Sequence, residues 1–270
     1  MAIQTTQQAR LQDDLRGLVA GQVRCDEIVA QLYATDAGPL EYRPAGVVWP
    51  RTAADVSAVV RYCAEEGIPV HPRGSGTTTA GGALGPGVVL DFTRHMKRLL
   101  HVEGDTILVQ PGAIRERLND ILKRSVGRFF APSTGFLPID TLGGILSTDI
   151  AGPRWLRYGF PHDFVEELEV VLADGTISNL KTVTQNELAG NSIPSPIQTS
   201  AEIIRQAKAD LTMEQPALKA GYASNLLREA FNDSGFHPQR LLTGPCIPEP
   251  RIMLRLTGKR IGSWLLILTY

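Results

Sequence analysis

Between residues 42 and 70, two short apolar runs flank a segment whose apolar residues recur at helical spacing. This pattern predicts a strand, a helix and a second strand. Residues 47–50 (VVWP) have the apolar run and closing proline of a short strand. Thr52 can then cap a helix that Gly67 would end. Residues 68–70 supply the second strand. The buried stripe of this helix would consist of Val56, Val59, Val60 and Cys63.

The same patterns predict elements on either side of this βαβ-like opening. Residues 88–92 and 106–110 are strand candidates, and residues 170–177 predict a hairpin whose turn is Asp174-Gly175. A short amphipathic helix would carry Ile114, Leu118, Ile121 and Leu122. Residues 1–41 are predicted to form a helical arm that packs on the rest. One face of this arm would hold Leu11, Leu15, Leu18 and Val19, and another Ile28 and Leu32.

A first glycine loop, residues 71–82 (HPRGSGTTTAGG), follows the second strand at its C-terminal end, where open α/β sheets bind ligands. Glycine allows positive φ and close approach to the backbone, and successive amides can form a nest for an anion. Arg73 adds a fixed positive charge. The loop suits a nucleotide diphosphate, although a ligand-free surface turn has the same composition. It is neither a Rossmann fingerprint, because Thr79 occupies the third glycine position, nor a P-loop.

A second glycine segment, residues 141–159 (TLGGILSTDIAGPRWLRYG), contains a predicted short helix. Gly143 and Gly144 would lie at its N-terminus, where we expect unpaired amides to point outward as another anion site. A glycine-rich linker is the alternative interpretation, but linkers are seldom so apolar. Arg154 and Arg157 would either bind a carboxylate or phosphate or face solvent.

Composition and charge narrow the possible functions. The 270 residues carry a net charge of −1, so no global field attracts nucleic acid or acidic lipid. Cys25, Cys63 and Cys246 lie far apart, which predicts no metal site within this chain and fits a reducing compartment. We expect no secretory signal and no transmembrane segment. A cytoplasmic protein is therefore expected, with membrane attachment only through a partner.

Five motifs in order resemble the FAD-linked oxidase family with the vanillyl-alcohol-oxidase (PCMH) type of FAD-binding domain. They cover residues 42–175, and they are most similar to the glycolate oxidase FAD subunit and the D-2-hydroxy-acid (D-lactate) dehydrogenases. The matching text comprises residues 47–60, IPVHPRGSGT, GPGVVLDFTRHMKRLL with VQPG, TLGGILSTDIAGPRWLRYG, and DFVEELEVVLADG.

The resemblance implies an α+β fold, a PCMH-type FAD-binding domain of two α/β subdomains at residues 42–245, with the flavin between them. The diphosphate would lie against Arg73, Gly74, Ser75, Gly76 and Thr77. Pro132 and Ser133 would lie near the isoalloxazine ring. The flavin and ribityl chain would contact Thr141, Leu142, Gly143, Gly144, Thr148, Asp149 and Gly152, and the nearby strand edge would supply Tyr158, Gly159, Asp163 and Val165. The FAD would be non-covalent, because Thr77 stands where relatives with covalent flavin often carry histidine.

Three departures from the family pattern matter, and one is Ser133-Thr134 after Pro132, where the family usually has an aspartate-proline pair. Asp149 stands where the family usually has asparagine, so its carboxylate would either repel the diphosphate or point away from it. The resemblance also stops after residue 245, and residues 246–270 are expected to be an atypical tail in place of the family's substrate domain. A truncated or frame-shifted gene is our hypothesis for this ending.

The functional hypothesis is a flavoenzyme, or its flavin-binding half, that oxidises a small D-2-hydroxy acid such as glycolate or D-lactate. An iron–sulfur or other electron-transfer subunit would be its partner. A non-catalytic FAD-binding subunit is the alternative, and the loop disfavours a nicotinamide enzyme. No catalytic residue is identified. His71 would be structural or touch phosphate, and His162 would be structural or approach the flavin edge.

Overall fold

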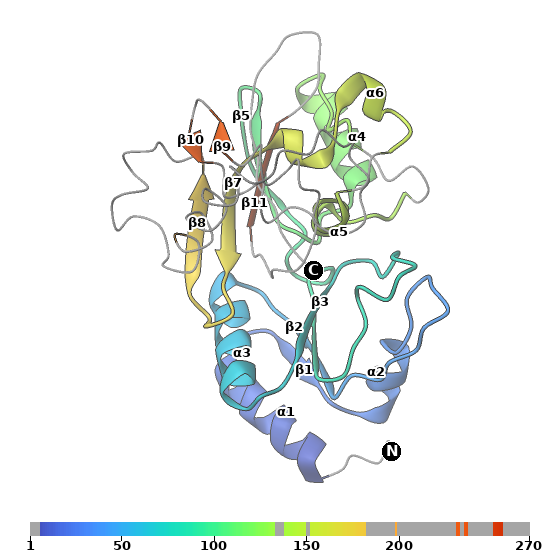
Figure 1. Ribbon diagram of the computed structural model, residues 1–270, viewed down its shortest axis with the longest axis vertical. Helices are drawn as coiled ribbons and strands as arrows, with labels where there is room; N and C mark the ends of the chain where they lie inside the picture. The colour runs from blue at the N-terminus through green and yellow to red at the C-terminus, as the bar shows by residue number, and fades with distance from the viewer. Residues whose placement is uncertain are drawn as a thin grey trace, which may run out of the picture.

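Two β-sheets, each covered by its own helices, lie one above the other in the computed structural model (Figure 1). The lower sheet and its helices come from the first part of the chain, and the upper sheet from the remainder. The structure describes residues 6–132, 138–149 and 152–181, together with Gln198, Phe231–Asn232, Gly235–Phe236 and Arg251–Arg255.

The first sheet has the strand order β1-β2-β4-β3. Strands β2, β4 and β3 are parallel, and β1 pairs with β2 in the antiparallel direction. The parallel strands agree with the predicted βαβ opening, since a helix connects β2 to β3. These elements are β1 (Gln22–Arg24), β2 (Gly46–Trp49), α3 (Ala53–Glu65), β3 (Val70–Arg73) and β4 (Val88–Asp91).

Helix α3 confirms its sequence prediction. The Thr52 hydroxyl accepts a hydrogen bond from the Asp55 amide at 3.1 Å, which caps the first turn. After the C-cap at Glu66, Gly67 has φ +66° and ends the helix. Its predicted stripe is buried and consists of Val56, Val59, Val60 and Cys63.

Alternate residues of the sheet pack against helices on opposite faces. Val48 and Leu90 belong to a cluster with α1 (Thr6–Leu18) and α3, whereas Val47 and Val89 pack with α2 (Glu27–Leu32). The residues before position 42 therefore contribute to the first core.

The prediction of a wholly helical arm was wrong in two respects. Residues 22–24 form strand β1, because their backbone pairs with the edge of β2. Ile28 and Leu32 are 58% and 69% exposed, and Val29 and Ala30 face the core instead.

The second sheet has the order β5-β6-β11-β7-β8 and is antiparallel throughout. Strand β11 lies between β6 and β7, although residues 246–270 were expected to form a tail. The position of a domain boundary near residue 245 stays a prediction. The strands are β5 (Leu99–Glu103), β6 (Thr106–Val109), β7 (Val165–Val171), β8 (Ile177–Lys181) and β11 (Arg251–Arg255), and β9 (Phe231–Asn232) pairs separately with β10 (Gly235–Phe236).

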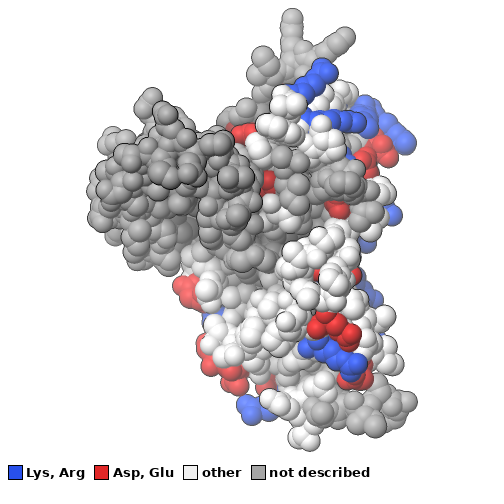
Figure 2. Space-filling model, turned by 45° about the vertical axis from the view of Figure 1, so that its right-hand side comes forward, with Lys and Arg blue, Asp and Glu red and all other residues white. Residues whose placement is uncertain are grey.

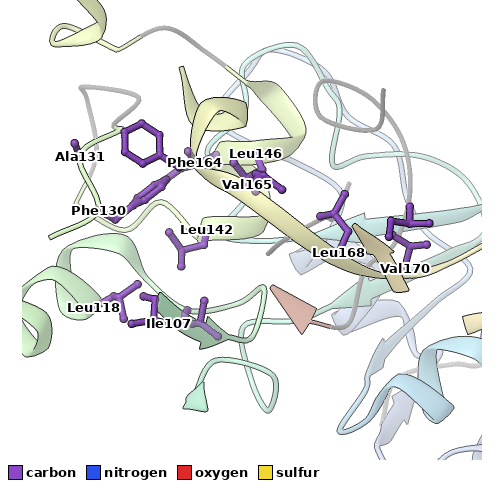
Figure 3. Packing of buried hydrophobic residues seen from close by; sticks show 14 of the residues in the cluster. Ile107, Leu118, Phe130, Ala131, Leu142, Leu146, Phe164, Val165, Leu168 and Val170 are labelled. Atoms are coloured by element: carbon purple, nitrogen blue, oxygen red, sulfur yellow. The ribbon is translucent and has the colours of Figure 1, made fainter. Parts of the chain in front are cut away.

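The second core lies between this sheet and the helices that follow β6 (Figure 3). Within this core, Phe130 and Phe164 meet edge to face, with ring centroids 5.7 Å apart. The buried Asn119 side chain bonds both the N–H and the C=O of Phe130, which fixes the chain before the second glycine segment. The helices are α4 (Arg115–Ser125), α5 (Leu142–Thr148), α6 (Trp155–Tyr158) and the 3₁₀ turn η1 (Pro161–Phe164).

The β7–β8 hairpin of the second sheet contacts the helix that covers the first sheet. Its turn is the predicted Asp174-Gly175, with Gly175 at φ +82°. The Ser57 hydroxyl of α3 donates to the Gly175 carbonyl, and Val171 packs into the first core. The end of the second sheet thus rests on α3.

Candidate functional site

The first glycine loop, which follows β3, begins with a row of four consecutive backbone amides. The backbone N–H groups of Gly74, Ser75, Gly76 and Thr77 donate to no described residue. All four residues are half-buried, and Gly76 has φ +67°. Consecutive free amides bent by a positive-φ glycine form a concave group of donors that suits an oxyanion.

Arg73 lies behind this loop. Its guanidinium donates to the Thr35 carbonyl at 2.7 Å and more weakly to the carbonyls of Tyr33 and Ala83, each at 3.5 Å. A Cβ placed on Gly76 would lie 2.5 Å from Arg73 Nη2, so the positive charge sits directly against the loop backbone. Burial lowers the pKa of Arg73, and the nearby Tyr33, Asp91 and Asp36 oppose that shift. Direct contact between Arg73 and a diphosphate stays a prediction.

The amides at the N-terminus of α5 are not available, which corrects the prediction of a second anion site there. Leu142 N donates to the Ala113 carbonyl, and Gly143 N to the Pro111 carbonyl, both at 2.9 Å. Gly144 N donates to the hydroxyl of the N-cap, Thr141. Because the turn before α4 and the N-cap satisfy these donors, the helix start cannot offer them to a ligand.

The second glycine segment nevertheless lies against the first glycine loop. Thr77 Oγ1 donates to Asp140 Oδ1 at 2.9 Å, and the Ser75 hydroxyl donates to the Ile139 carbonyl. Gly74 has no room for a side chain, because Thr141 Oγ1 occupies the space that a Cβ would take. Two stretches more than 60 residues apart therefore meet at the junction of the two sheets.

Asp149 points away from this contact. It ends α5 in the left-handed conformation, at φ +43°, and its buried carboxylate accepts from the His162 amide at 3.1 Å. The other carboxylate oxygen lies 2.7 Å from His162 Nδ1. Of the two placements considered for this residue, the structure has the carboxylate directed toward His162. The His162 ring is itself buried and stacks on Phe160 at 5.5 Å.

The remaining predicted site residues are either buried, partly or fully exposed, or outside the described residues. Within the described residues, Pro132, Thr141, Leu142, Gly143, Asp149 and Val165 are buried, so their side chains belong to the protein interior. Asp163 accepts from the Phe160 amide at 2.7 Å and closes the η1 turn beside Gly159. Ser133 lies outside the described residues. The partly or fully exposed members are Gly144, Thr148, Gly152, Tyr158, Gly159 and Asp163.

Three further side chains have defined settings. His71 Nε2 lies 2.7 Å from the Pro86 carbonyl and its ring packs on Gly85, which agrees with the structural alternative. Arg157 lies over the ring of Tyr158 at 5.4 Å, and Arg154 is exposed.

The described surface on the face shown in Figure 2 carries charges of both signs. On the face shown in Figure 2, Lys and Arg gather at the upper end of the described surface, whereas acidic and basic side chains lie together at the lower end. Among the described residues, no cluster of three metal-ligating side chains occurs and no helix is long and apolar enough to span a bilayer.

Sequence reasoning missed the residues that support the first glycine loop from the N-terminal arm. Asp36 accepts hydrogen bonds from Gly81 N at 3.1 Å and Gly38 N at 2.7 Å. Ala37 N donates to the Thr78 carbonyl at 3.1 Å. The one local signal was the turn composition of residues 36–39 (DAGP), which indicates a bend but not what the bend touches.

Comparisons with known proteins show the family to which the chain belongs. Residues 44–181 match the family model described as FAD binding domain. The chain is 34% identical over 223 residues to the D-2-hydroxyglutarate dehydrogenase of Escherichia coli, covering 78% of this chain and 22% of that protein. It is 35% identical over 164 residues to glycolate oxidase subunit GlcD of Bacillus subtilis, covering 59% of this chain and 34% of that protein.

A solved structure shares the fold. The 4-ethylphenol oxidase from Gulosibacter chungangensis superposes with a TM-score of 0.59 at 19% identity, covering 94% of this chain and 43% of that one. The chain thus spans about a fifth of the length of the dehydrogenase and under half of the oxidase.

Proposed function

Because the chain belongs to the FAD-binding domain family, we propose that it holds FAD non-covalently at the junction of the first glycine loop and the second glycine segment. The single observation that carries this proposal is the row of four free amides at residues 74–77, placed against Asp140 and Thr141. These donors suit the diphosphate of the dinucleotide.

The residues of the junction have distinct roles in this proposal. The amides of Gly74, Ser75, Gly76 and Thr77 bind phosphate oxygens, and the Arg73 charge behind them offsets the negative charge. Thr141 holds Gly74 in place, and Gly144 and Thr148 offer the partly exposed side of α5 to the rest of the cofactor.

Non-covalent binding is supported by the settings of the described nucleophiles. His71 and His162 are engaged with the Pro86 carbonyl and with Asp149. Cys25 and Cys63 are buried in the first core, which raises the pKa of each thiol to about 12 and keeps it protonated. Thr77 stands in the loop position where covalent relatives often have histidine.

We further propose that the chain takes part in oxidising a small D-2-hydroxy acid, such as glycolate or D-lactate. Bound FAD would supply the hydride acceptor. The E. coli relative is named for D-2-hydroxyglutarate and the B. subtilis relative for glycolate, which supports this substrate class. The site supplies cofactor binding, and we assign no catalytic residue.

A second candidate is a non-catalytic FAD-binding subunit that acts with a partner chain, such as an iron–sulfur or other electron-transfer subunit. The observation that favours it is that one relative, glycolate oxidase subunit GlcD of B. subtilis, is named as a subunit.

The experiment that separates the two candidates is anaerobic reduction of the FAD-loaded chain. For an enzyme we expect glycolate, D-lactate or D-2-hydroxyglutarate to bleach the visible flavin absorbance, while L-lactate does not. Dithionite should bleach it in either case and shows that the flavin is reducible. Flavin that responds to dithionite but to no hydroxy acid would contradict the enzymatic proposal and support the subunit.

A further inference from the structure

The free amides of the first glycine loop can bind a ligand only if the loop keeps its shape before the ligand arrives, since ordering a loop on binding costs affinity. A brace segment, residues 33–40 of the N-terminal arm, contacts this loop at both ends. Its residues precede the region that matches the family model, which begins at residue 44.

At the start of the loop, Arg73 is the contact. Its guanidinium donates to the Thr35 carbonyl at 2.7 Å and lies over the Tyr33 ring at 5.2 Å. This arrangement places the arginine side chain under Gly76 and supports the bend there.

At the far end of the loop, Asp36 is the contact. One carboxylate oxygen accepts Gly81 N at 3.1 Å, and the other accepts Gly38 N at 2.7 Å. Gly81 has φ +77° and packs against the Leu40 side chain, and Ala37 N bonds the Thr78 carbonyl. One half-buried carboxylate thus closes the turn of the brace segment and ties it to the loop.

We propose that Asp36 is a positioning residue for the first glycine loop, which it holds in the shape that presents the amides of residues 74–77. This inference rests on the proposed function, because the loop's ligand is taken to be the diphosphate of FAD. Asp36 itself would not touch the cofactor, since its oxygens are committed to Gly38 and Gly81.

The test compares Asp36→Ala with Asp36→Asn and with a matched control, Asp174→Ala. Asp174 also closes a turn with its carboxylate, accepting Thr176 N at 2.8 Å, but it lies in the β7–β8 hairpin. We expect Asp36→Ala to weaken FAD binding, measured by flavin fluorescence, at least tenfold. Asp36→Asn should restore part of the affinity, because its amide oxygen can still accept one N–H. Asp174→Ala should bind FAD like the wild type.

Two readouts separate positioning from general loss of structure. The unfolding midpoint without FAD should fall no further for Asp36→Ala than for Asp174→Ala. Amide hydrogen exchange at Ala37 and Leu84, whose N–H groups bond the Thr78 and Gly81 carbonyls of the loop, should speed up in Asp36→Ala alone, again without FAD. Wild-type affinity in Asp36→Ala, or unchanged exchange over these residues, would overturn the inference. A wild-type chain that binds no FAD would overturn the proposed function instead, and the exchange measurement would still decide whether Asp36 braces the loop.

Discussion

At the scale of the residue, position 76 requires glycine both for its backbone conformation and for the space around it. Its φ of +67° lies in the left-handed region, where a side chain costs about 1–2 kcal/mol. The guanidinium of Arg73 also occupies the space behind it. A side chain here would therefore both strain the backbone and displace the positive charge that faces the loop.

We predict that Gly76→Val abolishes FAD retention, because the branched side chain would disturb the free amides on either side of it. The matched control is Gly67→Val, whose φ of +66° is nearly the same but whose surroundings are open within 4 Å. Both variants should lose comparable stability in a thermal melt, while only Gly76→Val loses FAD in equilibrium dialysis. Equal FAD binding by the two variants would show that the loop is not the binding site.

Single residues also show which features of the candidate site could be predicted from the sequence and which could not. Gly74 and Gly76 could be placed from the sequence in a loop that follows a strand, and the structure has them there, whereas the ligand of this loop stays a prediction. The placement of the Asp149 carboxylate could not be settled, because its partner, His162, follows a further turn and helix. The amides at the start of α5 were wrongly predicted to be unpaired. The acceptors of Leu142 N and Gly143 N, Ala113 and Pro111, lie about 30 residues upstream, whereas Gly144 N bonds the nearby N-cap, Thr141.

At the scale of the element, the sequence predicted correctly those helix ends that depend only on neighbouring residues. The two ends of helix α3 could be predicted from Thr52 and Gly67. The N-cap residue and the glycine that ends the helix each act within one helical turn. Strand β1 has three residues and alternates polar with apolar too briefly to be recognised. Strand β11 depends on its long-range pairing with β6 and β7.

The contact between the first glycine loop and the start of α5 can be measured as a coupling energy. We predict that Thr77→Val and Asp140→Ala destabilise the chain non-additively, with an interaction term of roughly 0.5–1.5 kcal/mol in urea unfolding. The reason is the bond from Thr77 Oγ1 to Asp140 Oδ1 at 2.9 Å. The double-mutant cycle cancels the free energy that Asp140 gains from its other partners, because Asp140→Ala loses those contacts whether or not Thr77 is present. Strictly additive effects would mean that the bond between Thr77 and Asp140 does not form in solution.

At the scale of the whole molecule, the contacts that join the described parts of the two cores include the two described above. One is the β7–β8 hairpin on α3, and the other is the contact of the first glycine loop with residues 139–141. A dinucleotide held at the second contact would touch residues from both parts. FAD should therefore stabilise the folded chain, by about 2.7 kcal/mol when its free concentration is 100 times Kd.

The most direct measurement is titration of the purified, flavin-free chain with FAD, followed by acid precipitation of the complex. We predict saturable binding of one FAD per chain, weaker binding of riboflavin, which lacks the diphosphate, and release of the yellow cofactor into the acid supernatant. A chain that shows no saturable FAD binding, or that binds riboflavin as tightly as FAD, would contradict the claim that the first glycine loop binds the diphosphate.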